Sequence, residues 1–184
     1  MIGSAAEGGS NWGGSVTSLR RACVVLTAAA GLGVALVPVA SADPLQTVDY
    51  VSEEGAWPLQ GSAHYAAPGD EIAVFESTSG RLWIDVSSGL KYLTVELSAP
   101  AGETLHTGTY TGARFRGQSD EAQTTPGIFV YTMGNVCSEA YADFTIDRLD
   151  KDADGRTTDV DATFVQHCGS PDGPATRGEV HFHA

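Results

Sequence analysis

The 184-residue sequence predicts an all-β protein: a single antiparallel β-sandwich of about eight or nine strands with one disulfide. Three observations support this prediction. Apolar and polar residues alternate with a period of two along most of the chain after residue 42, the same region holds no 3.6-residue apolar period, and 22 Gly and 8 Pro supply turns. Short strands between Gly- and Pro-rich turns are typical of sandwiches and barrels.

The alternation is clearest in seven segments: 72–76, 82–86, 92–97, 128–132, 142–147, 160–165 and 179–183. The first two are joined by Ser-Thr-Ser-Gly at 77–80, and a Gly-containing turn between two β-forming runs predicts a hairpin. In 92–97, Leu93, Val95 and Leu97 lie on one side of the expected strand and polar residues or Tyr lie on the other. Each segment therefore has one side suited to a core.

The later strands are expected on the same grounds. Segment 128–132 is bounded by Pro-Gly at 126–127 and Gly-Asn at 134–135, and the last three segments place an apolar residue at every second position. No internal repeat and no linker to a second domain interrupts the series. Residues 43–184 are therefore expected to form one domain, the secreted β-sandwich domain.

The N-terminal part has the pattern of a secretory signal peptide. Residues 22–40 form the only long uncharged apolar stretch, Arg20 and Arg21 precede it, and small residues end it at Ala42. We expect cleavage after Ala42, so that residues 1–42 are an N-terminal extension and signal peptide and the exported chain begins at Asp43. The expected localisation is secreted.

Three other interpretations of this region stay open. An uncleaved membrane anchor is weakened by Gly31, Gly33 and Pro38, and the arginine pair fits the twin-arginine export signal only loosely. Residues 1–15 are rich in Gly and Ser and precede the positive region, where signal peptides normally start. Translation from Val16 would leave a 27-residue signal.

The charge balance excludes some partners. The 23 acidic and 10 basic residues give a formal net charge of −13, and the exported part alone would carry −14. Binding to a phosphate backbone needs clustered Lys and Arg, so we expect no nucleic acid partner. Self-repulsion favours a monomer, and anionic membrane surfaces would repel the cleaved chain. The expected partner is an extracellular ligand, which the sequence does not identify.

Cleavage would remove Cys23 and leave Cys137 and Cys168. An even number of cysteines in an exported chain predicts a disulfide, and two buried free thiols are the alternative. The two positions are 31 residues apart, so closing this loop is worth roughly 3 to 4 kcal/mol in the chain-entropy model.

The C-terminal half also resembles a family of small exported bacterial β-domains of unknown function. The resemblance covers about half of the chain, and its most specific part is the Phe-x-Gln-His-Cys element that ends at Cys168. The matching motifs are Gly108-Thr109-Tyr110, Gly112-Ala113-Arg114-Phe115, Pro126-Gly127, Cys137, Phe144-Thr145-Ile146, Asp154-Gly155, 162–168, Pro174-Ala175 and Arg177-Gly178-Glu179-Val180. Family members usually have Asn where this chain has Ser138. The resemblance implies a disulfide-linked antiparallel sandwich and brings no established catalytic residue.

An acidic segment suggests a calcium site. Asp150, Asp152, Asp154 and Asp161 place carboxylates in the pattern of a calcium loop, and Gly155 permits a sharp turn. The flanking segments are not helical, so an EF-hand is not expected. The alternative is a β-hairpin whose turn is rich in Asp and Gly. Calcium is the cofactor that this segment suggests.

The histidines offer two further candidates. His181 and His183 share one side of the last expected strand, and with Glu179 they could bind zinc or copper. The alternative is a solvated polar side of a terminal strand. His167 is either a catalytic base or a structural neighbour of the disulfide, and no nucleophile has a recognisable setting beside it.

Aromatic side chains suggest a ligand-binding surface, because flat rings suit the apolar faces of pyranoses. Of these residues, Trp57 and Tyr65 are predicted to bind ligand, while Trp83 and Tyr131 fall inside expected strands, where core packing is the ordinary explanation. The complete set of candidates is Trp57, Tyr65, Trp83, Tyr92, Tyr110 and Tyr131.

Taken together, the sequence favours a secreted, non-catalytic binding or structural module. The first alternative is a carbohydrate-binding module with a calcium-stabilised hairpin between Asp150 and Asp161. The second is a small secreted hydrolase that uses acidic residues and His167.

Overall fold

The computed structural model describes residues 45–117 and 122–184, and these residues form strands and turns without any helix. The predicted signal segment 1–42, with its cleavage site at Ala42, lies outside the described residues. Within the described part, no helix could cross a membrane. The strands are β1 (Gln46–Ser52), β2 (Ser62–Ala66), β3 (Glu71–Glu76), β4 (Arg81–Ser88), β5 (Lys91–Ser98), β6 (Gly108–Phe115), β7 (Gly127–Thr132), β8 (Asn135–Val136), β9 (Ala140–Lys151), β10 (Thr157–Cys168) and β11 (Ala175–His183).

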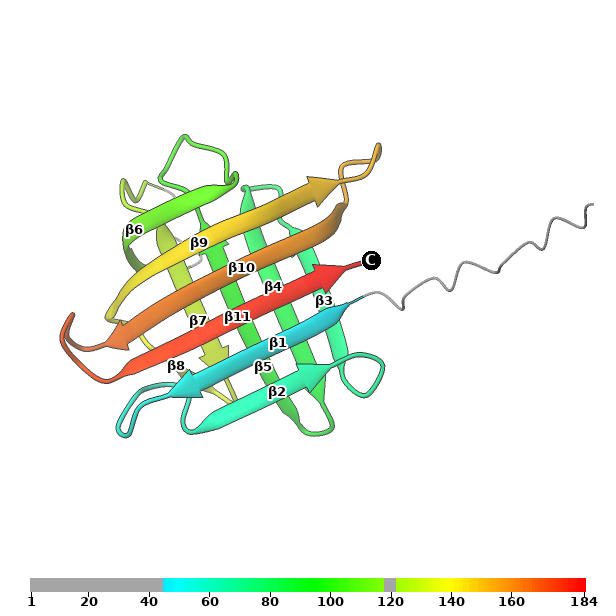
Figure 1. Cartoon of the computed structure of the whole chain (residues 1–184). Coiled ribbons are helices and arrows are strands. Elements are labelled where there is room, and N and C mark those ends of the chain that lie inside the picture. The colour runs from blue at the N-terminus through cyan, green and yellow to red at the C-terminus, as the bar shows by residue number, and fades with distance from the viewer. Residues whose placement is uncertain (1–44, 118–121) are drawn as a thin grey trace, which may run out of the picture. The chain divides into compact units, whose positions relative to one another are not determined.

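These strands form one continuous, nearly closed barrel-like sheet in the order β2-β1-β11-β10-β9-β6-β7-β5-β4-β3, and β8 pairs with β7 off this path. In Figure 1, β6, β9, β10, β11, β1 and β2 form the front layer, and β7, β5, β4 and β3 form the rear layer behind them. The layers join where β6 runs parallel to β7 for only two residue pairs, Arg114 with Gly127 and Phe115 with Ile128.

The two ends of the sheet meet by packing. β2 and β3 are the end strands of the order, and β3 packs against β1 and β10 in the front layer. An ion pair between Lys151 at the end of β9 and Glu76 at the end of β3 also links the two layers. The closure therefore depends on side chains rather than on a backbone ladder between β2 and β3.

The core lies between the two layers and follows from the two-residue period of the strands. In β4, for example, Leu82, Ile84 and Val86 are at most 1% exposed. Removing such side chains from water contributes about 25 cal/mol for each Å² of apolar surface. The largest fully buried apolar side chains are Phe144, Leu82, Ile84, Leu93, Leu97, Ile128, Ile146, Val48, Val86, Val95 and Val130.

Two glycines are required because a side chain lies against their backbone. A Cβ at Gly178 on β11 would lie 2.2 Å from the ring of Phe164, its partner on β10. A Cβ at Gly127 on β7 would lie 2.6 Å from Cδ of Arg116. Because Gly127 has no side chain, the aliphatic part of Arg116 can pass over β7 at this point. The Arg116 guanidinium then reaches Ser98 and Ala99 at the end of β5.

The predicted disulfide is confirmed: Cys137 and Cys168 are bonded, with Cα atoms 5.7 Å apart. Cys168 ends β10 opposite Ala140, the first residue of β9. The disulfide therefore clamps the open end of the long β9–β10 hairpin.

The all-β prediction is confirmed, but its details need correction. The described residues form eleven strands rather than eight or nine, and they belong to one continuous sheet, so a sandwich of two separate sheets is not confirmed. The sheet also contains the parallel β6–β7 pair, whereas only antiparallel pairing was expected. The alternation of residues predicts where strands run, but strand partners are set by contacts between distant segments.

Candidate functional site

The outer side of the rear layer carries a cluster of aromatic rings, called the aromatic face below. It consists of Phe75 on β3, Trp83 on β4, Tyr92 on β5, and Phe129 and Tyr131 on β7. Each has at least one chain neighbour buried in the core, so the two-residue period turns these rings outward. Phe75 is 45% exposed and Tyr92 36%, and the other three are half-buried. The cluster is therefore a surface feature rather than part of the core.

Strand register arranges one row of this face across four strands. Phe75 lies opposite Trp83, Trp83 opposite Glu96, and Glu96 opposite Phe129. The rings of Phe75 and Trp83 are nearly parallel, with centroids 6.1 Å apart and an interplanar angle of 5°. The backbones of Trp83 and Phe129 are two strands apart, about 9.5 Å. Glu96 lies between them.

Hydroxyl groups border the rings at the Tyr131 end. The rings of Tyr92 and Tyr131 lie 5.3 Å apart, and the Tyr92 hydroxyl donates to the Tyr131 hydroxyl at 2.7 Å. The neighbouring Tyr92 hydroxyl, and to a lesser degree burial, raises the pKa of Tyr131. The Thr94 hydroxyl donates to Asp85 at 2.7 Å. The face thus combines apolar rings with oriented polar groups.

A hollow of about 310 Å³ opens between these rings. It is lined by Trp83, Thr94, Glu96, Arg116, Phe129 and Tyr131. Mostly apolar and aromatic walls with a few fixed polar groups are typical of ligand sites. The hollow is therefore the strongest candidate for a binding site on this face.

Buried charged side chains supply the polar part of the hollow, and one of them is Glu96. Glu96 is only 2% exposed, and its carboxylate accepts a hydrogen bond from Arg81 at 2.8 Å. Burial raises the pKa of Glu96, while the charges of Arg81 and Arg116 act in the opposite direction. The Arg116 guanidinium donates to Ser98 Oγ at 3.1 Å and to the Ala99 carbonyl at 2.7 Å. These contacts hold Arg81 against Glu96 and hold Arg116 at the wall of the hollow.

The two residues predicted to bind ligand occupy different settings. Trp57 is 41% exposed and donates from its indole nitrogen to the Val136 carbonyl at 3.0 Å. Because Val136 lies opposite Tyr131, Trp57 borders the sheet beside the aromatic face. Tyr65 packs against the core, and burial is the largest cause of its raised pKa. Their predicted role in ligand binding stays a prediction.

The interpretation of Trp83 and Tyr131 as core residues is wrong, because both side chains project outward from their strands and are half-buried. Tyr110 is the aromatic candidate that does belong to the core. It is 8% exposed and stacks on Phe144 with centroids 4.7 Å apart, and its hydroxyl bonds the backbone of His106. Tyr110 is therefore not accessible to a ligand.

The acidic segment forms the turn between β9 and β10. The Asp152 carboxylate accepts hydrogen bonds from the backbone N–H groups of Asp154 and Arg156, each at 2.9 Å. The Arg156 guanidinium lies 3.8 Å from Asp152 and 3.6 Å from Asp154. The segment is therefore the turn of the β9–β10 hairpin, and protein groups of both signs stabilise it.

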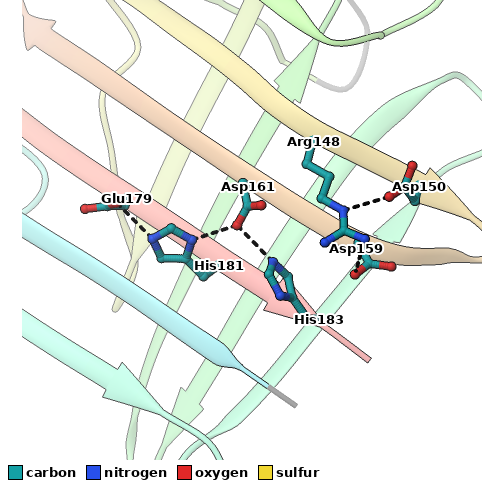
Figure 2. Close-up of polar contacts among 7 residues, drawn as sticks. All are labelled: Arg148, Asp150, Asp159, Asp161, Glu179, His181 and His183. Carbon is teal, nitrogen blue, oxygen red and sulfur yellow. Dashed lines mark hydrogen bonds and ion pairs between the residues drawn. The ribbon is translucent and has the colours of Figure 1, made fainter. Parts of the chain in front are cut away.

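The other two predicted calcium ligands lie further along the hairpin, as Figure 2 shows. Asp150 accepts a hydrogen bond from Arg148 at 2.7 Å, and the same guanidinium lies 3.0 Å from Asp159. Asp161 contacts a pair of histidines instead. The four predicted ligands are therefore shared among different cationic partners and do not converge.

The histidines of β11 form a hydrogen-bonded network with carboxylates (Figure 2). Asp161 Oδ1 lies 2.7 Å from His181 Nδ1 and 3.0 Å from His183 Nε2, and His181 Nε2 lies 2.8 Å from Glu179 Oε1. Since carboxylates only accept hydrogen bonds, both contacts of His181 require the imidazolium form. The bond to Asp161 raises the pKa of His181, burial opposes this effect, and Glu179 adds to it.

Within the described part of the chain, no group of three or more His, Cys, Asp or Glu side chains is arranged to hold a metal ion. The calcium site at Asp150, Asp152, Asp154 and Asp161 and the zinc or copper pair on β11 stay predictions. His167 adjoins the disulfide at Cys168, and its Nδ1 lies 2.6 Å from the Gly173 carbonyl.

No family model, curated protein or solved structure matches the chain. The resemblance to small exported bacterial β-domains therefore stays a prediction.

Phe75 and Phe129 were missed as candidates, as was the Arg81–Glu96 pair. The signal for the two rings was present, since both occupy strand positions that alternate with apolar core residues. The ion pair could not be found in this way, because it joins two strands at a separation of 15 residues.

Proposed function

We propose that the chain is an exported, non-catalytic binding module that holds a glycan on its aromatic face. The observation that carries the proposal is the hollow of about 310 Å³ between Trp83, Phe129 and Tyr131, with Glu96 and Arg116 in its lining. Exposed aromatic clusters rimmed by polar groups mark interaction sites on otherwise polar surfaces.

Glycans fit the chemistry of this face better than purely apolar ligands do. The C–H faces of pyranose rings stack on flat aromatic rings, and the nearly parallel Phe75 and Trp83 offer such a surface. Sugar hydroxyls need both donors and acceptors, which Thr94 and the Tyr131 hydroxyl supply at the rim. Because the row crosses several strands, an extended chain of sugars suits it better than a single sugar.

Export is part of the proposal. It is supported by the signal-like pattern that ends at Ala42 and by the disulfide between Cys137 and Cys168, a bond that persists in oxidising compartments. The non-catalytic part is supported by the state of Glu96, which is buried and already paired with Arg81. A glycosidase uses two carboxyl groups that reach the scissile bond.

Affinity electrophoresis in gels that contain soluble glucans or xylan, together with pull-down on cellulose and chitin, tests the proposal. We expect the purified protein to be retained by at least one polysaccharide and Trp83→Ala to weaken retention roughly tenfold, because a stacked ring is lost. Tyr141→Ala, which removes an outward ring from the front layer, is the matched control and should leave retention unchanged.

Melting curves of both variants check that each remains folded. No retention on any polysaccharide, or equal losses in Trp83→Ala and Tyr141→Ala, would contradict the glycan proposal. Release of reducing sugar from a bound polysaccharide would contradict the non-catalytic part and favour the hydrolase alternative.

A further inference from the structure

A second pocket, of about 250 Å³, lies on the outer side of the front layer near the disulfide and shares no residue with the hollow of the aromatic face. Strand register brings its main side chains together. Arg114 on β6 lies opposite Tyr141 on β9, and Tyr141 lies opposite His167 on β10. Asp143, two residues beyond Tyr141, is on the same side of β9.

Arg114 supplies the positive group of this pocket. Its guanidinium carbon lies 3.6 Å from the centroid of the Tyr141 ring, so stacking holds the side chain in place. Arg81, Arg148 and Arg177 each have a carboxylate partner, whereas Arg114 has none among the described residues. Its N–H donors are therefore available to a planar anion such as a carboxylate.

Asp143 supplies the negative group, and an irregularity in β6 fixes its position. The register between β6 and β9 shifts between Tyr110 and Ala113, and the N–H of Gly112 donates to Asp143 Oδ1 at 2.7 Å. Such bulges are often found beside functional sites. The second carboxylate oxygen of Asp143 remains able to accept a hydrogen bond from a ligand.

His167 and the loop after β10 complete the pocket. The hydrogen bond of His167 Nδ1 to the Gly173 carbonyl places the proton on Nδ1, because a carbonyl only accepts. Nε2 is then the nitrogen left for a ligand. Val165 and Pro171 add apolar lining.

We propose that this pocket binds a free α-amino acid with a small aliphatic side chain. The carboxylate would pair with Arg114 and the ammonium with Asp143, while Val165 and Pro171 contact the side chain. Diagonal neighbours on adjacent strands lie about 7–8 Å apart. Arg114 and Asp143 are such diagonal neighbours, so one small ligand can contact both side chains.

The charges of the pocket select a zwitterion over a simple ion. An anion without an ammonium would meet Asp143, and also Glu139, which accepts a hydrogen bond from the Tyr141 hydroxyl at 3.2 Å. A cation without a carboxylate would meet Arg114. A ligand that carries both charges satisfies both sides.

Isothermal titration of the purified protein with L-alanine, L-valine and L-leucine tests the inference. We expect at least one to bind, and we expect its analogues without the ammonium or without the carboxylate to bind at least tenfold more weakly. Absence of binding for all three amino acids would overturn the proposal. Equal binding of the plain carboxylate analogue would also overturn it, because the pocket would then be a simple anion site.

Variants locate the site. Arg114→Gln and Asp143→Asn should each weaken binding roughly 10- to 100-fold, the range expected for a hydrogen bond to a charged group. Arg177→Gln, an exposed arginine on β11, is the matched control and should bind normally. If Arg114→Gln melts early, Arg114→Lys keeps the charge but loses the planar fork and should still bind more weakly. Unchanged affinity in Asp143→Asn, or in both Arg114 variants, would overturn the assignment.

Discussion

The disulfide gives the sharpest test of how the fold is stabilised. Cys137 lies just beyond β8, and Cys168 is the last residue of β10, opposite the first residue of β9. The bond therefore closes a loop that contains the entire β9–β10 hairpin. Replacing both cysteines by Ala, or reducing the bond in the natural chain, removes this constraint.

The size of the effect follows from the length of the loop. For a sequence separation of 31, the chain-entropy model gives about 3.7 kcal/mol at 25 °C. With an unfolding entropy of about 2 cal/mol/K for each residue of the domain, this free energy corresponds to a decrease in Tm of about 12 °C. Cys137 is 1% exposed, so the double Ala variant also loses packing, and its decrease should be the larger of the two.

Guanidinium unfolding followed by tryptophan fluorescence, with and without reductant, measures the difference. The reduced natural chain isolates the loop term, because no atoms other than the bonded thiols change. A loss below about 1 kcal/mol on full reduction would refute the reasoning. It would mean that the unfolded chain keeps the β9–β10 hairpin, so that the disulfide constrains little.

Two further predictions concern polar groups. Gln166 is 2% exposed, and its side-chain amide has no hydrogen-bond partner among the described residues. Gln166→Met should therefore raise the free energy of unfolding by about 1–3 kcal/mol, measured by chemical unfolding. A loss of stability in this variant would contradict the prediction. The pKa of His181 is raised, chiefly by its hydrogen bond to Asp161. The protonated form of His181 therefore stabilises the fold fully below the ordinary pKa of 6.5, and this stability is lost as the pH rises through the pKa of the folded state. Tm should therefore fall over that range in the natural chain and less so in His181→Gln; parallel profiles would contradict the assignment.

The strands with strong alternation could be predicted from the sequence, and the weak ones could not. β4, β5 and β7 place large apolar residues at every second position and coincide closely with the expected segments. β2 has only Ala63 and Tyr65 on its inner side, and β8 has two residues. In neither strand is the alternation of apolar and polar residues long enough to distinguish a strand from a loop. Edge and short strands are recognised mainly through their partners.

Closure of the sheet could not be predicted for a different reason. The joint between the layers depends on two residue pairs of β6 and β7, and the contact of β3 with β1 and β10 depends on side chains from distant parts of the chain. Alternation reports which side of a strand is apolar, and it does not report which strand lies beside it. The choice of neighbouring strand decides whether one continuous sheet or two separate sheets form.

The same limit explains the aromatic face. In β4 and β7, apolar residues occupy both sides of the strand, since Trp83 and Phe129 alternate with Ile84 and Ile128. A strand that is apolar on both sides predicts burial on both sides, as in a strand covered by a second layer. The outer side of the rear layer has no such cover in the described chain. Packing within the fold does not account for the exposed apolar surface of the aromatic face, and a bound ligand of the proposed kind would cover it.

The outer side of the front layer differs from the aromatic face, because it carries charged side chains in place of aromatic rings. Asp49 on β1 and Glu179 on β11 are direct cross-strand partners, an arrangement that repels in a chain of net charge −13. Each carboxylate contacts an imidazole, His64 at 2.6 Å from Asp49 and His181 at 2.8 Å from Glu179. The pKa of His181 is raised, chiefly by Asp161, and the ion pair of its charged form with Glu179 reduces this repulsion. Part of the electrostatic stability of the front layer therefore depends on pH through His181, whereas stacking on the rings of the rear layer does not. The proposed glycan binding should therefore persist over the range in which His181 titrates.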